Sequence, residues 1–107
     1  MRPISLIQTG VGVSVPIPMD WRADPFSATL DALVSGAAPT YTIQYTCDDI
    51  RTPGWNPATA NWESVAGMTA VANAPSTANL VSPVTAVRIN QTAGAGSTTL
   101  RVLQAGF

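Results

Sequence analysis

The sequence predicts an all-β protein, an antiparallel β-sandwich of the Ig-like or jelly-roll-like kind. Apolar and polar residues alternate with a period of two in several segments, the pattern of strands with one buried face, whereas helical periodicity is almost absent. Turn-forming Gly, Pro, Asn and Asp residues separate these segments at short intervals. Several segments carry apolar side chains on both faces, which favours two packed sheets over one. A chain of 107 residues is long enough for one such domain, over residues 1–107.

The N-terminal residues 1–18 are predicted to form an extended arm or an edge strand. Four apolar residues alternate with Gly, Ser and Pro in this stretch and are expected to share one buried face, namely Val11, Val13, Val15 and Ile17. Pro16 and Pro18 have no backbone N–H to donate to a neighbouring strand. The stretch is therefore expected at the edge of a sheet and not at its centre.

Residues 26–34 are predicted to form the next strand. Phe26, Ala28, Leu30, Ala32 and Val34 alternate with Ser27, Thr29, Asp31 and Leu33, which favours a strand. A helix that begins near Asp24 is the alternative. The strand is the preferred interpretation because the alternation has no gap.

The clearest strand pattern lies in residues 40–47, whose β-branched and aromatic side chains suit a pleated, half-buried surface. One face would carry Tyr41, Ile43, Tyr45 and Cys47, and the other Thr42, Gln44 and Thr46. The single cysteine of the chain is therefore expected to be a small buried side chain.

Residues 48–79 are predicted to form a long loop region that carries Trp55 and Trp62. Pro-Gly and Asn-Pro dipeptides in its first half are turn signals, and residues 66–79 are expected to be irregular. Adjacent acids at its start, Asp48 and Asp49, are expected to form a turn that ends the preceding strand. Calcium binding is the alternative there, because carboxylate oxygens suit that ion.

Two strands are predicted near the end of the chain, in residues 86–92 and 98–104. The glycine-rich residues 93–97 join them, so the two strands are expected to pair as a hairpin. One face of the first strand would carry Val87, Ile89 and Gln91. Arg88 and Arg101 are expected to be solvated edge charges, with an anionic patch on a partner as the alternative.

The composition excludes most catalytic chemistry. The chain has no His and one Cys, so it holds no Ser-His-Asp triad, no His-ligated metal and no Cys-based metal site. It has no Lys and five scattered Arg, which gives no basic face for a nucleic acid. No apolar stretch approaches the roughly 20 residues that span a bilayer. We therefore expect a protein that is not an enzyme, with no cofactor or metal and no binding to nucleic acid or membrane.

The surface chemistry predicted by the composition is neutral. Charged residues make up 10% of the chain, against about 25% in an ordinary soluble domain. Thr and Ser, 13 and 8 in number, are the main polar residues instead. Such side chains lose less entropy when fixed than Lys or Glu do, and the cores of protein interfaces are poor in Lys, Glu and Asp. The surface is therefore expected to be covered by neighbouring subunits.

The candidate contact residues are aromatic and apolar. The chain has three Trp, and Trp is frequent among the residues that anchor protein–protein contacts. Core packing is the alternative for Trp21, Trp55 and Trp62, and stacking on sugars is another. The Trp-bearing loop and the N-terminal arm are expected to make the contacts, the arm by adding a strand to a neighbour's sheet. The predicted partner-binding residues are Trp55, Trp62, Arg51, Ile4, Leu6, Val13 and Val15.

Four short motifs follow one another in the second part of the sequence. Residues 41–49 read YTIQYTCDD and precede the Trp-bearing loop. After that loop come PVTAVRIN at residues 83–90, QTAGAGS at 91–97 and LRVLQ at 100–104. This series of motifs resembles small structural proteins of tailed bacteriophages, over about residues 40–105.

The resemblance implies a virion component with a β-sandwich fold and no enzymatic activity. The most specific expectation is a head decoration (cement) protein that binds the outer capsid surface, contacts the major capsid protein, and bridges and stabilises its subunits. Self-association into a dimer or trimer is expected as well. The alternative is a tail-fibre or head–tail accessory module, including one that binds a glycan of the host surface.

The expected location is the virion, assembled in the host cytoplasm. Residues 1–8 place one Arg before a short apolar run. That run is shorter than the roughly 7–15 apolar residues of a secretory signal. Synthesis in the cytoplasm is therefore expected.

Overall fold

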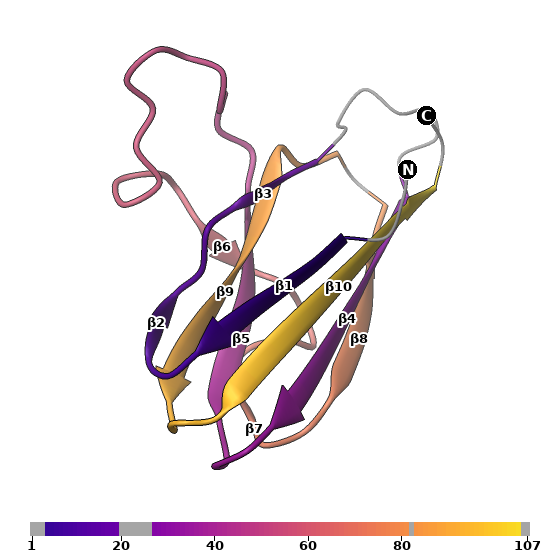
Figure 1. Ribbon diagram of the computed structural model, residues 1–107. Helices are drawn as coiled ribbons and strands as arrows, with labels where there is room; N and C mark the ends of the chain where they lie inside the picture. Colours follow the sequence, from indigo (N-terminus) through magenta and orange to yellow (C-terminus); the bar gives the residue numbers. More distant parts are fainter. Residues whose placement is uncertain (1–3, 20–26, 82, 106–107) are drawn as a thin grey trace.

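The computed structural model describes residues 4–19, 27–81 and 83–105. In this part of the chain the regular structure is β-strand, and the strands form two antiparallel sheets packed face to face (Figure 1). The same residues contain no helix that is long and apolar enough to cross a membrane. The predicted all-β antiparallel sandwich is confirmed.

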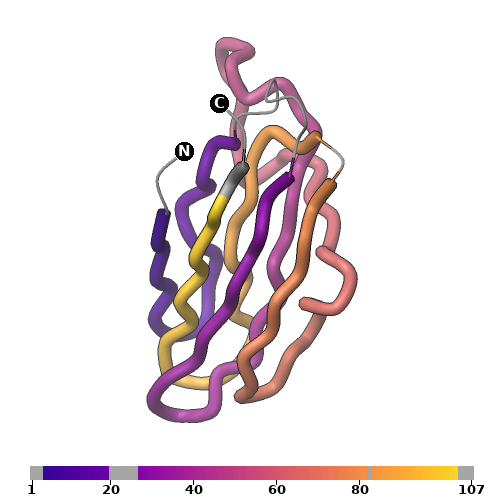
Figure 2. The backbone as a smooth tube through the Cα atoms, turned by 90° about the vertical axis from the view of Figure 1, so that its right-hand side faces the viewer, coloured from indigo at the N-terminus to yellow at the C-terminus, as the bar shows by residue number. Residues whose placement is uncertain are grey.

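Each sheet combines strands from both halves of the chain. Sheet A has the order β1 (Ile4–Thr9), β10 (Ser97–Ala105), β4 (Ser27–Ser35) and β8 (Ser76–Leu80). Sheet B has β9 (Ala86–Ala93) and β5 (Thr40–Thr46) at its centre, β2 (Gly12–Val13) and β3 (Ile17–Pro18) beside β9, and β6 (Glu63–Ser64) and β7 (Val71–Ala72) beside β5. In Figure 2 the strands of sheet A follow one another from indigo β1 through β10 and β4 to orange β8.

The chain crosses repeatedly between the two sheets. β1 is followed by β2 and β3 in sheet B, β4 lies in sheet A, β5 to β7 lie in sheet B, and β8, β9 and β10 alternate between the sheets. This connectivity is that of a jelly roll, which closes a sandwich with strands that cross between its two layers. Of the two kinds of sandwich expected, the structure has the jelly-roll kind.

The core lies between the two sheets and is apolar. Its buried side chains are Ile17, Met19, Ala28, Leu30, Ala32, Tyr41, Ile43, Val65, Met68, Val84, Val87, Ile89, Leu100 and Val102. The alternation in the two middle segments is confirmed, since β4 turns Ala28, Leu30 and Ala32 inward and β5 turns Tyr41 and Ile43 inward. The helix considered for the first of these segments is wrong.

The predicted C-terminal hairpin is wrong, because β9 and β10 lie in different sheets. In sheet B, β9 pairs with β5, β2 and β3. In sheet A, β10 pairs with β1 and β4. A buried amide shapes the connection between them. The Gln91 Nε2 donates to the carbonyls of Gly94 at 3.0 Å and Gly96 at 2.8 Å, while its Oε1 accepts from the Thr98 hydroxyl at 3.0 Å. These bonds satisfy a polar side chain inside the sandwich and direct the chain across it.

The N-terminal segment forms edge strands of both sheets, and its predicted buried face is wrong. Val13 pairs with Asn90 and Ile17 with Val87, so four steps along this segment match three steps along β9. This extra residue is a bulge, which shifts the alternation by one position. Val11, Val13 and Val15 are therefore exposed, whereas Ile17 is buried. Buried Ser14 takes the inward place, and its hydroxyl accepts the Ile89 N–H at 2.8 Å.

The region predicted as a long loop contains three strands, one of them of ordinary length. β8 extends sheet A along β4, with Ala28 opposite Leu80 and Leu30 opposite Ala78. Ala, Asn and Ser have low β-propensity, so the pairing with β4 decides the conformation here. The expectation of an irregular segment over residues 66–79 is therefore wrong for its C-terminal part.

Cys47 lies outside the core, and the expectation of a buried thiol is wrong. β5 ends at Thr46, and Cys47 is exposed at the turn that follows. The Thr46 hydroxyl accepts the Asp48 N–H at 3.1 Å, and the Thr85 N–H binds the Thr46 carbonyl at 2.9 Å. These bonds end the strand one residue before the cysteine.

Candidate functional site

A shallow groove on the outside of sheet B brings together two segments that are far apart in the sequence. We define residues 11–16 as the valine segment and residues 48–62 as the Trp loop, which extends beyond the end of the sandwich in Figure 1. The groove between them has a volume of about 350 Å³. Its lining residues are Val13, Ser14, Val15, Pro16, Asn56, Pro57, Ala58 and Arg88. Apart from the Arg88 guanidinium, these lining side chains are uncharged.

Beside the groove, two tryptophans and an arginine form the cluster that holds the Trp loop on the sheet. The rings of Trp55 and Trp62 have centroids 6.4 Å apart and are tilted by 57°. The guanidinium carbon of Arg88 lies 4.2 Å from the Trp62 ring centroid, within the range of a cation–π interaction. The indole N–H of Trp62 donates to the Pro57 carbonyl at 2.8 Å.

Arg88 lies at the centre of this arrangement. It is half-buried on β9, directly opposite Gln44 of β5, and its Nε donates to the Gln44 Oε1 at 2.8 Å. Its Nη1 lies 3.5 Å from the Pro57 carbonyl. Burial lowers the pKa of the guanidinium from its ordinary value, but the group stays charged at neutral pH. The expectation of a solvated edge charge is therefore wrong for Arg88.

The turn of the Trp loop that lines the groove is fixed by hydrogen bonds of its own residues. The Asn56 Oδ1 accepts the Ala58 N–H at 2.9 Å, and the Asn56 carbonyl accepts the Thr59 N–H at 3.1 Å. Such Asx turns set the backbone without help from the core. They place Pro57 against both Trp62 and Arg88.

The structure gathers some of the predicted contact residues and separates others. Trp55, Trp62, Val13 and Val15 lie in or beside the groove. Arg51 is exposed on the Trp loop but does not line the groove. Ile4 and Leu6 lie on β1 in sheet A, where they pack partly buried against the core. Trp21 lies outside the described residues.

The sequence interpretation did not include Arg88, Asn56, Pro57 or Ala58 in the site. A signal for Arg88 was present, because the alternation places it on the outward face of a central strand, opposite the face of Ile89. A cation on such a face needs a partner or a cover. The partner is Trp62, and only the folded loop brings it there.

The tryptophans offer little free ring surface for a sugar. Arg88 covers one face of Trp62, and the indole N–H of Trp55 is buried and has no hydrogen-bond partner among the described residues. Both rings are half-buried. This geometry suits a packed cluster beside an apolar groove better than an open stacking platform.

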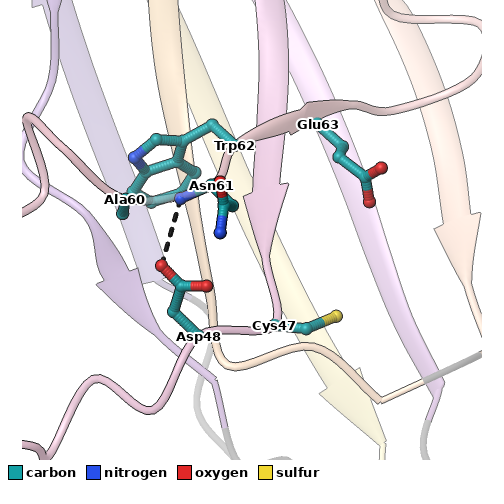
Figure 3. Close-up of a pocket in the computed structure, with 6 residues that line it drawn as sticks. All are labelled: Cys47, Asp48, Ala60, Asn61, Trp62 and Glu63. Atoms are coloured by element: carbon teal, nitrogen blue, oxygen red, sulfur yellow. Dashed lines mark hydrogen bonds between the residues drawn. The ribbon is translucent and has the colours of Figure 1, made fainter.

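A second hollow, of about 580 Å³, lies at the base of the Trp loop (Figure 3). Cys47, Asp48, Asn61, Trp62 and Glu63 line it together with Ala60. The Asp48 carboxylate accepts the Asn61 N–H at 3.1 Å, drawn as a dashed line in Figure 3. No group of three His, Cys, Asp or Glu side chains is placed to hold a metal ion within the residues that the structure describes.

The adjacent acids Asp48 and Asp49 bind backbone N–H groups of the Trp loop, as the turn interpretation expected. Asp49 accepts the Arg51 N–H through its Oδ1 at 3.1 Å, and Asp48 binds the far end of the loop. Both are hydrogen bonds between a carboxylate and a backbone N–H, and the Asp49 bond is of the kind that stabilises tight turns. The Asp48 bond joins residues 13 apart and closes the Trp loop at its base.

We expect Arg88→Gln to loosen the Trp loop. The substitution removes the cation over Trp62, an interaction that contributes about 0.5 kcal/mol at exposed sites and about 2 kcal/mol when desolvated, equivalent to about a two- to thirtyfold change in a local opening equilibrium. Trypsin cleavage after exposed Arg51 should accelerate by that factor, measured by mass spectrometry of the fragments. Arg101→Gln, on sheet A, is the matched control and should leave the rate unchanged. Equal acceleration by both variants would contradict the role of Arg88.

No protein-family model matches the sequence, and no curated protein matches it. A solved structure described as a Bacillus endospore appendage, of a family of disulfide-linked pili, is similar over 94% of this chain and 80% of its own. The TM-score is 0.51 and the sequence identity is 16%. At this identity the likeness shows a shared fold.

Proposed function

We propose that the chain is a structural subunit of a larger assembly and has no enzymatic activity. In its specific form the proposal is a bacteriophage head decoration protein, located in the virion, that binds the outer capsid surface and bridges subunits of the major capsid protein. The observation that carries it is the groove between the valine segment and the Trp loop, whose lining is uncharged apart from Arg88, on a chain with 10% charged residues.

Three features of the groove favour a protein partner. Val13 and Val15 are exposed beside each other on one wall, where an isolated domain would gain by carrying polar side chains. The opposite wall is held in place by the tryptophan cluster, so little conformational entropy is lost when a partner binds. Arg88 lines the groove, and Arg is enriched at protein interfaces.

Binding would stabilise the shell by mass action. A protein that binds the mature lattice and not the dissociated or immature subunits shifts the equilibrium toward the mature lattice. Contact with two capsid subunits at once makes release slower than from either alone, because the second contact is intramolecular. The chain needs no reaction chemistry for this role.

Co-sedimentation with capsids of the phage that encodes the chain tests the proposal. The purified protein should pellet with mature shells and not with immature ones. Val15→Asp should weaken binding at least tenfold, because it places a charge on the groove wall, where residue 15 is 74% exposed in the free protein. Val81→Asp, at a site 67% exposed and outside the groove, is the matched control and should bind as the parent does. Failure to pellet with either kind of shell would contradict the proposal.

A filament subunit is the second candidate. The fold likeness to a pilus subunit favours it, since that protein is described as disulfide-linked pili. This sequence has one Cys, and one thiol joins two copies at most, so a filament of this chain would depend on non-covalent contacts. Electron micrographs of the concentrated protein, with and without reductant, distinguish the candidates: filaments in both conditions would favour this role over decoration of a shell.

A further inference from the structure

The two sheets differ in how their edges are protected. Both edges of sheet B carry features that hinder the pairing of a further strand. Pro16, Pro18 and a bulge interrupt its β2–β3 edge, and the opposite edge consists of two two-residue strands with Glu63 in one of them. Short strands, prolines, bulges and charges are the devices by which proteins prevent further strands from pairing.

The two edge strands of sheet A, over the residues that the structure describes, carry none of these devices. β1 reads ISLIQT and β8 reads STANL, without a charge or a proline. The charged residues of the strands in this sheet, Asp31 and Arg101, lie opposite each other on the two central strands. Among the described residues, no other segment donates or accepts a backbone hydrogen bond along the outer side of β1 or β8. Within this described part of the chain, both edges therefore offer backbone groups to an incoming strand.

The apolar side chains beneath these edges are incompletely covered. Ile4 and Leu6 on β1, and Ala78 and Leu80 on β8, pack against the core but remain partly exposed. A hollow of about 410 Å³ opens next to β8, with Leu80 in its wall. An additional strand at either edge would complete the burial of these residues.

The order of sheet A favours one partner, a second copy of the chain. Its four strands run alternately up and down, so β1 and β8 point in opposite directions. When two copies stand side by side in the same orientation, β8 of one meets β1 of the next as an antiparallel neighbour. The joined sheet keeps its alternation without a break, and β1 and β8 are close in length, six and five residues.

We propose that β8 of one copy pairs with β1 of the next and joins the chains head to tail through sheet A. Leu6 of the incoming β1 then lies beside Ala78 and Leu80 of the receiving β8. Such heterologous contacts continue beyond a dimer, into a ring or an open row. This inference goes beyond the proposed function, because it concerns the contact of the protein with itself and uses the edges of sheet A instead of the groove on sheet B.

Sedimentation velocity of the purified full chain with single substitutions tests the pairing. Ile7→Lys places a charge on β1, at a side chain that is 62% exposed, and Thr77→Lys does the same on β8. Each variant should associate at least tenfold more weakly than the parent, because edge lysines oppose strand addition. Leu103→Lys is the matched control, since it changes an exposed apolar residue of the same sheet on central strand β10. It should associate as the parent does.

A mixture of the two edge variants separates head-to-tail pairing from a symmetric dimer. The Ile7→Lys copy keeps a free β8 and the Thr77→Lys copy keeps a free β1, so the mixture should form a heterodimer and stop there. A parent protein that stays monomeric to about 1 mM would overturn the pairing, as would a mixture that forms no heterodimer. Neither result affects binding to capsids through the groove, so the two proposals fail separately. Thermal melts of each variant confirm that it is folded.

Discussion

Gly94→Ala is expected to lower the free energy of unfolding by about 2–4 kcal/mol, a large part of the stability of a small domain. Gly94 lies in the connection between β9 and β10 with φ +88°, a region that L side chains rarely adopt. A Cβ at this position would lie 2.5 Å from the Ala38 carbonyl oxygen and 2.8 Å from the Pro39 Cα. Both neighbours are backbone atoms of the β4–β5 connection, so the two connections would have to separate.

A second glycine isolates the effect of the contact from that of the backbone angle. Gly67 has φ +85°, and a Cβ there would meet nothing within 4 Å. Gly67→Ala should therefore cost only the strain of the left-handed conformation, about 1 kcal/mol. Urea denaturation of both variants measures the difference. Equal losses would mean that the two connections are not packed as closely as the structure has them.

Val87→Ala and Ile43→Ala are each expected to cost about 2–4 kcal/mol, because each leaves a cavity in the core. The two residues lie on the central strands of sheet B and are fully buried. Their burial was predicted from alternation alone, and the structure confirms it. Thermal or urea unfolding gives the loss.

The matched control for the valine is a valine on the surface. Val81→Ala removes the same two methyl groups from an exposed side chain and should change stability by less than about 0.5 kcal/mol. Similar losses at positions 81 and 87 would contradict the assignment of β9 to the centre of the sandwich.

The sequence predicts strands here better than it predicts which strands pair. The alternation around Leu30 and Ile43 was sufficient to find β4 and β5, because each has one fully buried face. The same alternation could not show that β10 leaves β9 for the other sheet. That depends on the Gln91 amide, whose partners Gly94, Gly96 and Thr98 are also compatible with an ordinary turn.

A single inserted residue accounts for the largest error about the surface. The period of two placed Val13, Val15 and Ile17 on one face, but the bulge between the first and the last of them moves the valines outward. The consequence is functional, because these valines form one wall of the groove. Pro16 is the one sign of irregularity in the sequence at this point.

Only part of the candidate site could be predicted from the sequence. Trp55 and Trp62 were singled out by residue type, and they do lie together. Arg88 was assigned to solvent, because nothing in a linear sequence relates residue 62 to residue 88. Only the return of the Trp loop over sheet B creates that contact.

Hydroxyl-radical footprinting of the chain, free and bound to a mature capsid, tests most directly whether the groove is what a partner covers. Oxidation is measured by mass spectrometry at Val13 and Val15, with Val81 and Leu103 as exposed references elsewhere on the surface. We expect oxidation of the two groove residues to fall at least severalfold on binding, while the references change little. Unchanged oxidation at the groove, with protection confined to other surfaces of the bound chain, would contradict this.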